Sequence, residues 1–263
     1  MNNELPLLLE PQQLAALLPS DNILLVDLSR AQIYRQAHLP NAIHLDFKKT
    51  QRTEPPVGLL PDISQLEALL SELGLRDDLH VVAYDDEGGG WAGRFLWLLE
   101  SVGHTSYSYL NGGIHAWLAE DLPYEEGAAI AKRSDYRIKA VRADVSVDID
   151  YLLEHHADGE HIIWDARSLD EYNGVRVFAQ KGGHIPGAIQ YEWTEALDGS
   201  ESMRLKPKAQ LLAELSARGI DMHKRVVVHC HTHHRSGLSW LVGKYLEFND
   251  VRAYPGSWSE WGN

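Results

Sequence analysis

The only cysteine of the 263-residue chain, Cys230, follows a run of three β-branched apolar residues, 226–228. Such a run predicts a buried strand. A short polar loop comes next, and apolar residues at helical spacing from Leu238 to Leu246 then predict a helix. The thiol therefore stands at the carboxyl end of a predicted strand, which is the edge where open α/β sheets bind their ligands.

The loop after Cys230 has the composition of an anion cradle. A loop that runs into a helix start points several backbone N–H groups inward, and these groups with the helix dipole lower the pKa of a thiol from about 8.5. Arg235 adds a fixed positive charge at the far end of the loop. A lone cysteine is more often a small buried hydrophobe. Here the four polar residues, the arginine and Ser236 that follow it favour a nucleophile.

The composition excludes several classes of function. A count of 24 Lys+Arg against 38 Asp+Glu gives a formal net charge of -14, which argues against nucleic-acid binding. One cysteine cannot form an internal disulfide, which suits a reducing compartment. Residues Met1 to Leu5 lack the features of a signal peptide, and no apolar run reaches the roughly 20 residues of a membrane span. We therefore expect a cytoplasmic protein that does not bind membranes.

A series of four segments occurs twice along the chain. The matching pairs are Leu24–Ser29 with Ile162–Arg167, His38–Ile43 with His184–Ile189, Val81–Asp85 with Val226–Cys230, and Asn111–Trp117 with Pro255–Trp261. The offset grows from 138 residues (Asp27 to Asp165) to 146 (His38 to His184), which predicts an insertion around residues 172–183. Strands alternate with helices in each copy, so we expect two α/β domains, each a doubly wound and mainly parallel sheet flanked by helices. One of these helices runs from Ser64, with Ser64 and Glu67 as its capping box.

The loop from Cys230 to Arg235 resembles the active-site loop of the rhodanese family of sulfurtransferases, in which four residues separate the cysteine from an arginine or another loop-closing residue. Its run Cys-x-Thr-His-His-Arg-Ser is similar to that of a bacterial subgroup of two-domain thiosulfate sulfurtransferases. The His-x-Pro-Gly-Ala segment at 184–188 and the Gly-Ser-Trp-x-x-Trp segment at 256–261 also resemble family motifs. The resemblance covers the whole chain and implies two tandem rhodanese-like domains.

The two copies differ at the position of the nucleophile. Asp85 stands where Cys230 stands in the second copy, and a carboxylate cannot accept a sulfur atom. We expect residues 1–121 to form an inactive rhodanese-like domain, 122–143 a linker without sustained periodicity, and 144–263 the catalytic domain.

The resemblance implies a ping-pong reaction without a metal or an organic cofactor. The Cys230 thiolate attacks the outer sulfur of thiosulfate, sulfite leaves, and cyanide or a thiol then takes the sulfur from the persulfide. Such a thiolate needs local positive potential. The residues that we expect to bind substrate or persulfide are His231, Thr232, His233, His234, Arg235, Ser236 and Arg167. The resemblance directs Arg167 at the substrate, whereas a salt bridge with a nearby acid is the alternative.

Three positions bear on the choice of sulfur donor. His233 and His234 stand where other branches of the family carry fixed cations or small residues, and Asn173 stands near the place of a second arginine in the mercaptopyruvate branch. Recognition of a carboxylate is weakened, so we expect thiosulfate to be preferred over mercaptopyruvate.

Other interpretations remain open. A phosphatase or arsenate reductase would use a similar loop, but with five residues between cysteine and arginine. The histidines at 229, 231, 233 and 234 suggest a metal-binding module, although adjacent residues in a tight loop rarely aim at one point. The protein could also be a mercaptopyruvate sulfurtransferase, or a carrier that delivers sulfur or selenium to a partner enzyme.

We expect a monomer with a small-molecule sulfur donor and a thiophilic acceptor, and an acceptor protein is a further partner.

Overall fold

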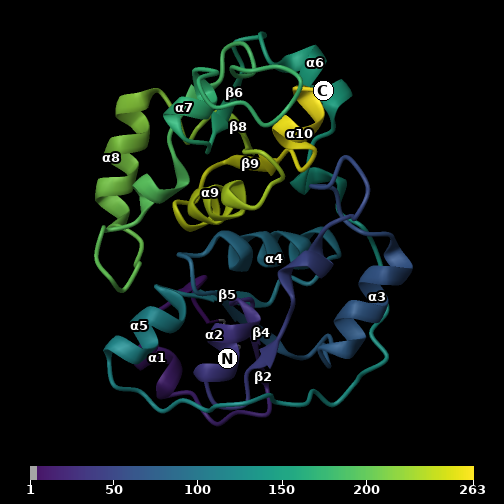
Figure 1. Ribbon diagram of the computed structural model, residues 1–263, viewed down its shortest axis with the longest axis vertical. Coiled ribbons are helices and arrows are strands. Elements are labelled where there is room, and N and C mark those ends of the chain that lie inside the picture. Colours follow the sequence, from purple (N-terminus) through teal and green to yellow (C-terminus); the bar gives the residue numbers. More distant parts are fainter. Residues whose placement is uncertain (1–4) are drawn as a thin grey trace. The chain divides into compact units, whose positions relative to one another are not determined.

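The computed structural model describes residues 5–263, so the first four residues of the segment used to argue against a signal peptide lie outside it. The chain divides into two compact units, each of which takes in a short segment from elsewhere in the sequence (Figure 1). The first unit comprises Met1–Thr50, Pro61–Arg142 and Asp198–Leu205, and the second comprises Gln51–Leu60, Ala143–Leu197 and Lys206–Asn263. Among the described residues, no helix has the length and apolarity that a membrane span requires.

The first unit is built on a five-stranded sheet of order β1-β5-β4-β2-β3, in which every pairing is parallel. Its strands are β1 (Leu8–Leu9), β2 (Ile23–Asp27), β3 (Ile43–His44), β4 (His80–Tyr84) and β5 (Tyr107–Leu110). Its helices are α1 (Pro11–Ala15), α2 (Ala31–Gln36), α3 (Ile63–Glu72), α4 (Gly90–Ser101) and α5 (Gly113–Ala119), with a 3-10 turn η1 at Phe47–Thr50.

The second unit repeats this topology with a four-stranded parallel sheet of order β7-β6-β8-β9. Its strands are β6 (His161–Asp165), β7 (Ile189–Gln190), β8 (Arg225–His229) and β9 (Asp250–Ala253). Its helices are α6 (Ile149–His155), α7 (Leu169–Tyr172), α8 (Lys208–Arg218), α9 (Arg235–Tyr245) and α10 (Ser257–Trp261), with 3-10 turns η2 (Ala143–Val145) and η3 (Trp193–Ala196). Strands β6 to β9 occupy the places of β2 to β5, which confirms the predicted fold class.

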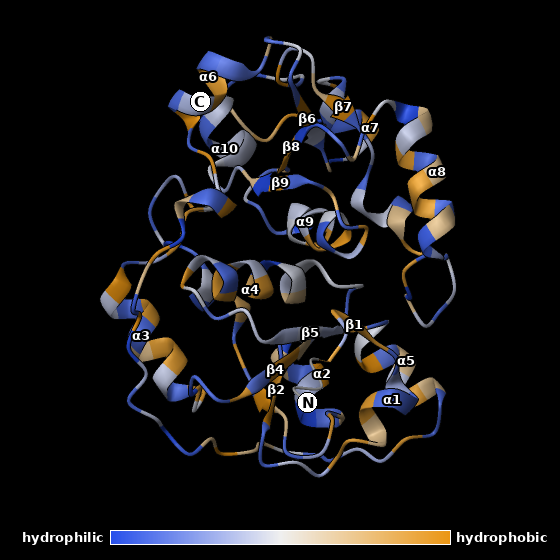
Figure 2. Cartoon of the chain, turned by 180° about the vertical axis from the view of Figure 1, so that it is seen from behind, coloured by the Kyte–Doolittle hydropathy of each residue, from blue (hydrophilic) through white to orange (hydrophobic). Residues whose placement is uncertain are grey.

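The apolar runs of the sequence form the buried centre of each sheet. Residues 226–228 of β8 are at most 1% exposed, and Val81 and Val82 of β4 are fully buried. Strands that are covered on both faces are expected to be continuous apolar runs. Helix α8 is amphipathic instead: Figure 2 shows polar and apolar residues alternating along it, and it buries Leu211 and Leu215.

The predicted start of helix α3 is wrong by a small shift. The helix begins at Ile63, and the capping box pairs the N-cap Asp62 with Gln65 rather than Ser64 with Glu67. The backbone N–H of Asp62 donates to the Gln65 side chain at 3.1 Å. Aspartate and serine are comparable N-caps, so the sequence allows two alternative helix starts, one at Asp62 and one two residues later at Ser64. Glu67 instead accepts a hydrogen bond from the backbone N–H of Ile138 at 3.0 Å.

Candidate active site

Cys230 lies directly after β8 and before α9, in the predicted strand-loop-helix setting, and its side chain is buried. The start of α10 holds its backbone in place. The N–H of Cys230 donates to the Ser257 hydroxyl at 3.3 Å, and its carbonyl accepts the N–H of Trp258 at 3.0 Å. The backbone of Cys230 is thus held in place on both its N–H and its carbonyl side.

The equivalent loop of the first unit shows what such a loop binds. The carboxylate of Asp85, at the end of β4, accepts four backbone N–H groups at 2.8 to 3.1 Å. These donors belong to Glu87, Gly89, Trp91 and Ala92. Burial, then the charge of Glu87, raises the pKa of Asp85 to about 7 although the N–H donors oppose that rise. The first unit therefore carries an anion cradle that its own carboxylate fills.

Loss of that carboxylate is expected to cost stability and little activity. In Asp85→Ala the loop N–H groups lose their acceptor, so the free energy of unfolding should fall by about 1–3 kcal/mol. Sulfur transfer should fall less than about tenfold because Cys230, the expected nucleophile, lies in the other unit. Chemical denaturation and steady-state rates measure the two effects. A loss of activity as deep as that of a Cys230 variant would contradict an inactive first unit.

The cradle of the second unit acts on the Cys230 thiol. Burial raises the pKa of this thiol, but the Arg235 charge, the Ser236 hydroxyl and the backbone N–H groups of Ser236 and Thr232 outweigh burial and hold the pKa below its usual value. The offset of 145 residues from Asp85 to Cys230 maps Glu87 to Thr232 and Trp91 to Ser236. The same backbone positions that bind a carboxylate in one unit therefore favour the thiolate in the other.

Arg235 is held by a buried acid that the sequence analysis did not single out. Its guanidinium nitrogens Nη1 and Nη2 donate to the two carboxylate oxygens of Glu171 at 2.6 and 2.8 Å. Glu171 also accepts the Ser168 hydroxyl at 2.9 Å. Burial raises the pKa of Glu171, but the hydrogen bonds and charge of Arg235 reverse this and lower it to about 2. Ser168 and Glu171 form the capping box of α7, a spacing that is visible in the sequence.

Arg167 forms the salt bridge that the sequence left open as an alternative. Its guanidinium donates to the Asp165 carboxylate, with Nη2 at 2.6 Å from Oδ2, and to the carbonyl of Gly183 at 2.8 Å. It also lies 4.3 Å from the centre of the Trp258 ring. His229, the residue before Cys230, places Nε2 3.6 Å from the same carboxylate. Arg167 and Asp165 are both almost fully buried, so this network supports the base of the loop.

The remaining loop side chains take different positions. His233 is fully buried with a φ of 58°, and its Nδ1 lies 2.8 Å from the Ser236 hydroxyl. His231, Thr232 and His234 are partly exposed. The ring of His231 lies 6.0 Å from that of Phe178, and the ring of His234 lies 5.8 Å from that of Trp193. Within residues 5–263, none of the loop residues belongs to a group of side chains close enough to hold a metal ion.

A glycine far away in the sequence touches the loop. Gly58 belongs to the segment Gln51–Leu60, which packs with the second unit. A Cβ atom on Gly58 would lie 1.9 Å from the carbonyl oxygen of Pro255 and 2.9 Å from that of Thr232. Both neighbours are backbone, so neither can swing aside as a side chain would. The position therefore requires glycine and fixes the outer side of the loop.

The Gly58→Ala variant is expected to displace the Cys230 loop and to lower kcat/KM at least about tenfold. The reason is that a shift of about 1 Å in a reacting group costs up to about a hundredfold in rate. Gly199→Ala is the control for backbone strain without a steric clash, because its φ is 77° but its Cβ would meet no atom within 4 Å. Steady-state kinetics of both variants test this prediction, and equal activity of the two would contradict it.

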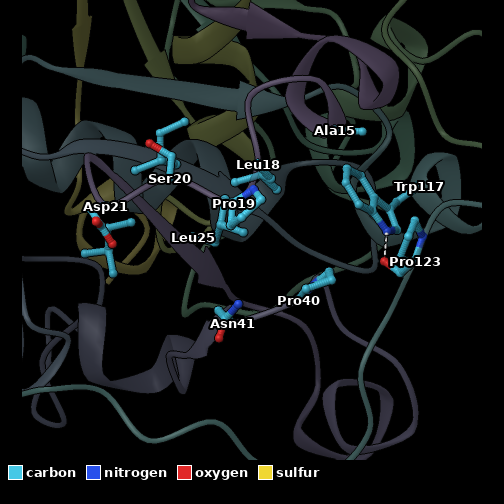
Figure 3. A pocket seen from close by; sticks show the side chains of 12 residues that line it. Ala15, Leu18, Pro19, Ser20, Asp21, Leu25, Pro40, Asn41, Trp117 and Pro123 are labelled. Atoms are coloured by element: carbon cyan, nitrogen blue, oxygen red, sulfur yellow. Dashed lines mark hydrogen bonds between the residues drawn. The ribbon is translucent and has the colours of Figure 1, made fainter.

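The cavity shown in Figure 3 lies elsewhere. It has a volume of about 640 Å³, belongs to the first unit, and is lined in part by Ile23 to Leu25 at the start of β2. Trp117 and Pro123 form part of its wall, with the indole N–H donating to the Pro123 carbonyl at 2.7 Å. Parallel sheets bind substrates at the carboxyl ends of their strands. This cavity borders the amino end and is not the site of Cys230.

A family profile described as "Rhodanese-like domain" matches residues 10–120 and 148–263. The chain belongs to the rhodanese family. It is 46% identical over 260 residues to the thiosulfate sulfurtransferase of Azotobacter vinelandii, covering 98% of this chain and 95% of the relative. It is 44% identical to the thiosulfate sulfurtransferase of Pseudomonas aeruginosa, covering 99% of this chain and 96% of the relative. The predicted resemblance is thereby confirmed.

A mercaptopyruvate enzyme is more distant in sequence and similar in fold. The 3-mercaptopyruvate sulfurtransferase of Escherichia coli K12 is 32% identical over 90% of this chain and 84% of its own length. The crystal structure of SseA from Escherichia coli, described as a 3-mercaptopyruvate sulfotransferase, matches with a TM-score of 0.86 and 28% identity. That match covers 97% of this chain and all of SseA. Both rhodanese-like domains are thus present along the chain.

Proposed function

We propose that this protein is a thiosulfate sulfurtransferase that carries the transferred sulfur as a persulfide on Cys230. The observation that carries the proposal is a buried thiol of lowered pKa in a loop whose counterpart binds a carboxylate through four N–H groups. Relatives named thiosulfate sulfurtransferase at 44% and 46% identity support it.

The residues of the loop account for both half-reactions. The Cys230 thiolate attacks the outer sulfur of thiosulfate, the S–S bond of the donor breaks, and sulfite leaves with the electron pair. The loop N–H groups stabilise the negative charge of donor, leaving group and persulfide. Cyanide or a thiolate then attacks the outer sulfur, the persulfide S–S bond breaks, and the Cys230 thiolate is regenerated. The chain has no second thiol that would divert the persulfide into an internal disulfide.

The engagement of Arg235 argues against phosphoryl chemistry. A phosphatase loop presents its arginine to the oxygens of a tetrahedral anion, usually with a bidentate grip. Here both terminal nitrogens of Arg235 donate to Glu171, and only four residues separate Cys230 from Arg235. The guanidinium therefore acts on the thiolate by its charge and by a side-chain hydrogen bond to Cys230, which suits a single sulfur atom.

The donor test uses cyanide as the common acceptor. We expect kcat/KM for thiosulfate to exceed that for mercaptopyruvate by at least about tenfold, a barrier difference near 1.4 kcal/mol. Mercaptopyruvate needs its carboxylate held, whereas Arg167 is paired with Asp165 and Asn173 is a neutral residue exposed at the end of α7. Thiosulfate needs only the N–H groups and the positive potential of the loop. A preference for mercaptopyruvate would refute the assignment of the donor.

Delivery of the sulfur to a protein acceptor is a second candidate function. The sulfur carrier protein TtuD of Thermus thermophilus is 32% identical over 88% of this chain. In the inserted loop of the second unit, Val175, Val177 and Phe178 are exposed, and Phe178 lies next to His231. Apolar side chains at the edge of a thiol site offer a contact for a protein acceptor. Persulfide-loaded protein added to a cell extract would identify the acceptor, and we place this reaction in the cytoplasm.

A further inference from the structure

A cluster of three side chains lies apart from Cys230, at the junction of α6 and β6. It consists of His155, the last residue of α6, Asp158 in the connecting turn, and His161, the first residue of β6. We propose that this cluster binds one divalent transition-metal ion of the zinc class and thereby ties α6 to the sheet. The sequence analysis expected no metal and did not single out these residues.

The ligand atoms are already close to the spacing that a metal requires. The Nδ1 atom of His155 lies 3.2 Å from Oδ2 of Asp158, and Nδ1 of His161 lies 2.8 Å from the same oxygen. The three ligand atoms all lie within 4.8 Å of one another. A tetrahedral zinc site with bonds of about 2.0–2.1 Å places its ligand atoms about 3.3 Å apart. His161 is buried, so small rotations of the exposed Asp158 and the partly exposed His155 would close the site around it.

The backbone aims the carboxylate at the two imidazoles. Oδ1 of Asp158 accepts the N–H groups of Glu160 at 2.8 Å and of His161 at 3.0 Å. These bonds occupy one carboxylate oxygen and leave the other pointing at both rings. The ring centroids of His155 and His161 are 4.9 Å apart. Because the turn itself fixes the acid, ligand binding does not need to order it.

Tyr151 supplies the outer partner that metal-bound histidines usually have. Its hydroxyl lies 2.7 Å from Nε2 of His161, and its ring lies 4.4 Å from that of His155. Without metal, Nδ1–H of His161 donates to Asp158 and Nε2 accepts from the tyrosine. With metal, the imidazole proton sits on Nε2 and donates to the tyrosine oxygen, which frees Nδ1 as a ligand. The His161 imidazole stays neutral in both states, because its proton only moves from Nδ1 to Nε2.

The ligand set selects the class of ion. Two imidazole nitrogens and one carboxylate oxygen suit Zn²⁺, with water as the fourth ligand, whereas Ca²⁺ and Mg²⁺ prefer oxygen ligands throughout. The cluster lies at the amino end of β6, and Asp165 ends the same strand beside the Cys230 loop. The ion would therefore sit at the opposite edge of the sheet from the reacting thiol and serve stability.

The test is a zinc titration by calorimetry on tag-free protein that carries Cys230→Ser, so that the thiol does not compete. We expect one Zn²⁺ per chain, at least about a hundredfold weaker binding in His155→Ala, and about 10- to 100-fold weaker binding in Tyr151→Phe. His223→Ala, which removes an exposed histidine of the same unit, should bind as the parent does. Equal thermal midpoints in EDTA verify that the variants fold.

The same samples give a second readout. Zinc should raise the thermal midpoint of the parent and of His223→Ala, because a ligand that binds only the folded state stabilises it. It should leave that of His155→Ala unchanged. Absence of binding in the parent, or equal binding in His155→Ala and the parent, would overturn the site and would show that the cluster is a hydrogen-bond network only. Either result leaves the proposed sulfur transfer untouched.

Discussion

The Cys230→Ser variant is expected to lose thiosulfate:cyanide sulfur transfer by at least about four orders of magnitude while keeping its fold. A serine hydroxyl does not ionise near neutral pH and cannot exchange a sulfane sulfur, and the chain has no other thiol to replace it. The substitution exchanges one small buried atom for another, so the thermal midpoint should change little. Thiocyanate formation measures the rate, and substantial activity in the variant would disprove the persulfide route.

The intermediate itself provides the control for this prediction. Intact-protein mass after thiosulfate treatment should show one added sulfur on the parent protein, and cyanide should remove it. The Cys230→Ser variant should gain nothing under the same treatment. An unchanged mass of the parent under both conditions would instead favour the phosphatase or metal-binding interpretation.

The fold was predictable because its signals are local and repeated. Runs such as 226–228 and Val81–Val82 are apolar and β-branched, and they became the central strands of the two sheets. The four matching segments occur in the same order in both halves of the chain. The simplest structure for such a repeat is two sheets with the same strand connections. The shifted capping box of α3 shows the limit: Asp62 and Ser64 both fit a local rule, and only the packed helix selects one.

The contacts that hold the Cys230 loop in place could not be predicted in the same way. Glu171 reaches Arg235 across 64 residues, and Gly58 meets the loop from a segment outside the second half of the chain. Neither contact leaves a periodic pattern in the sequence, although the capping box of Ser168 and Glu171 was visible. Sequence alone allowed Arg167 to serve either the substrate or Asp165. The structure shows the buried ion pair with Asp165, and a contact with substrate stays a prediction.

The second large effect is expected from Arg235→Gln, which should raise the pKa of the Cys230 thiol. Burial alone raises that pKa, and Arg235 is foremost among the groups that lower it, so its loss leaves burial less opposed. The acid limb of the rate profile of the first half-reaction should therefore move to higher pH, with a lower rate at neutral pH. The variant also leaves Glu171, which is 4% exposed, without its cation, and breaking a buried pair costs about 3–5 kcal/mol.

The variant Glu171→Gln separates the two consequences. It also breaks the ion pair and should lose stability, but it removes a negative charge near the thiol, so the acid limb should stay in place or move to lower pH. In the parent, the lowered pKa of Glu171, about 2 instead of 4.5, contributes stability that is present above pH 4.5 and lost as the pH falls toward 2. Both variants should lack this contribution in acid denaturation. If both variants moved the acid limb to higher pH, the charge of Arg235 would not be what activates the thiol, and the ion pair would serve the shape of the loop alone.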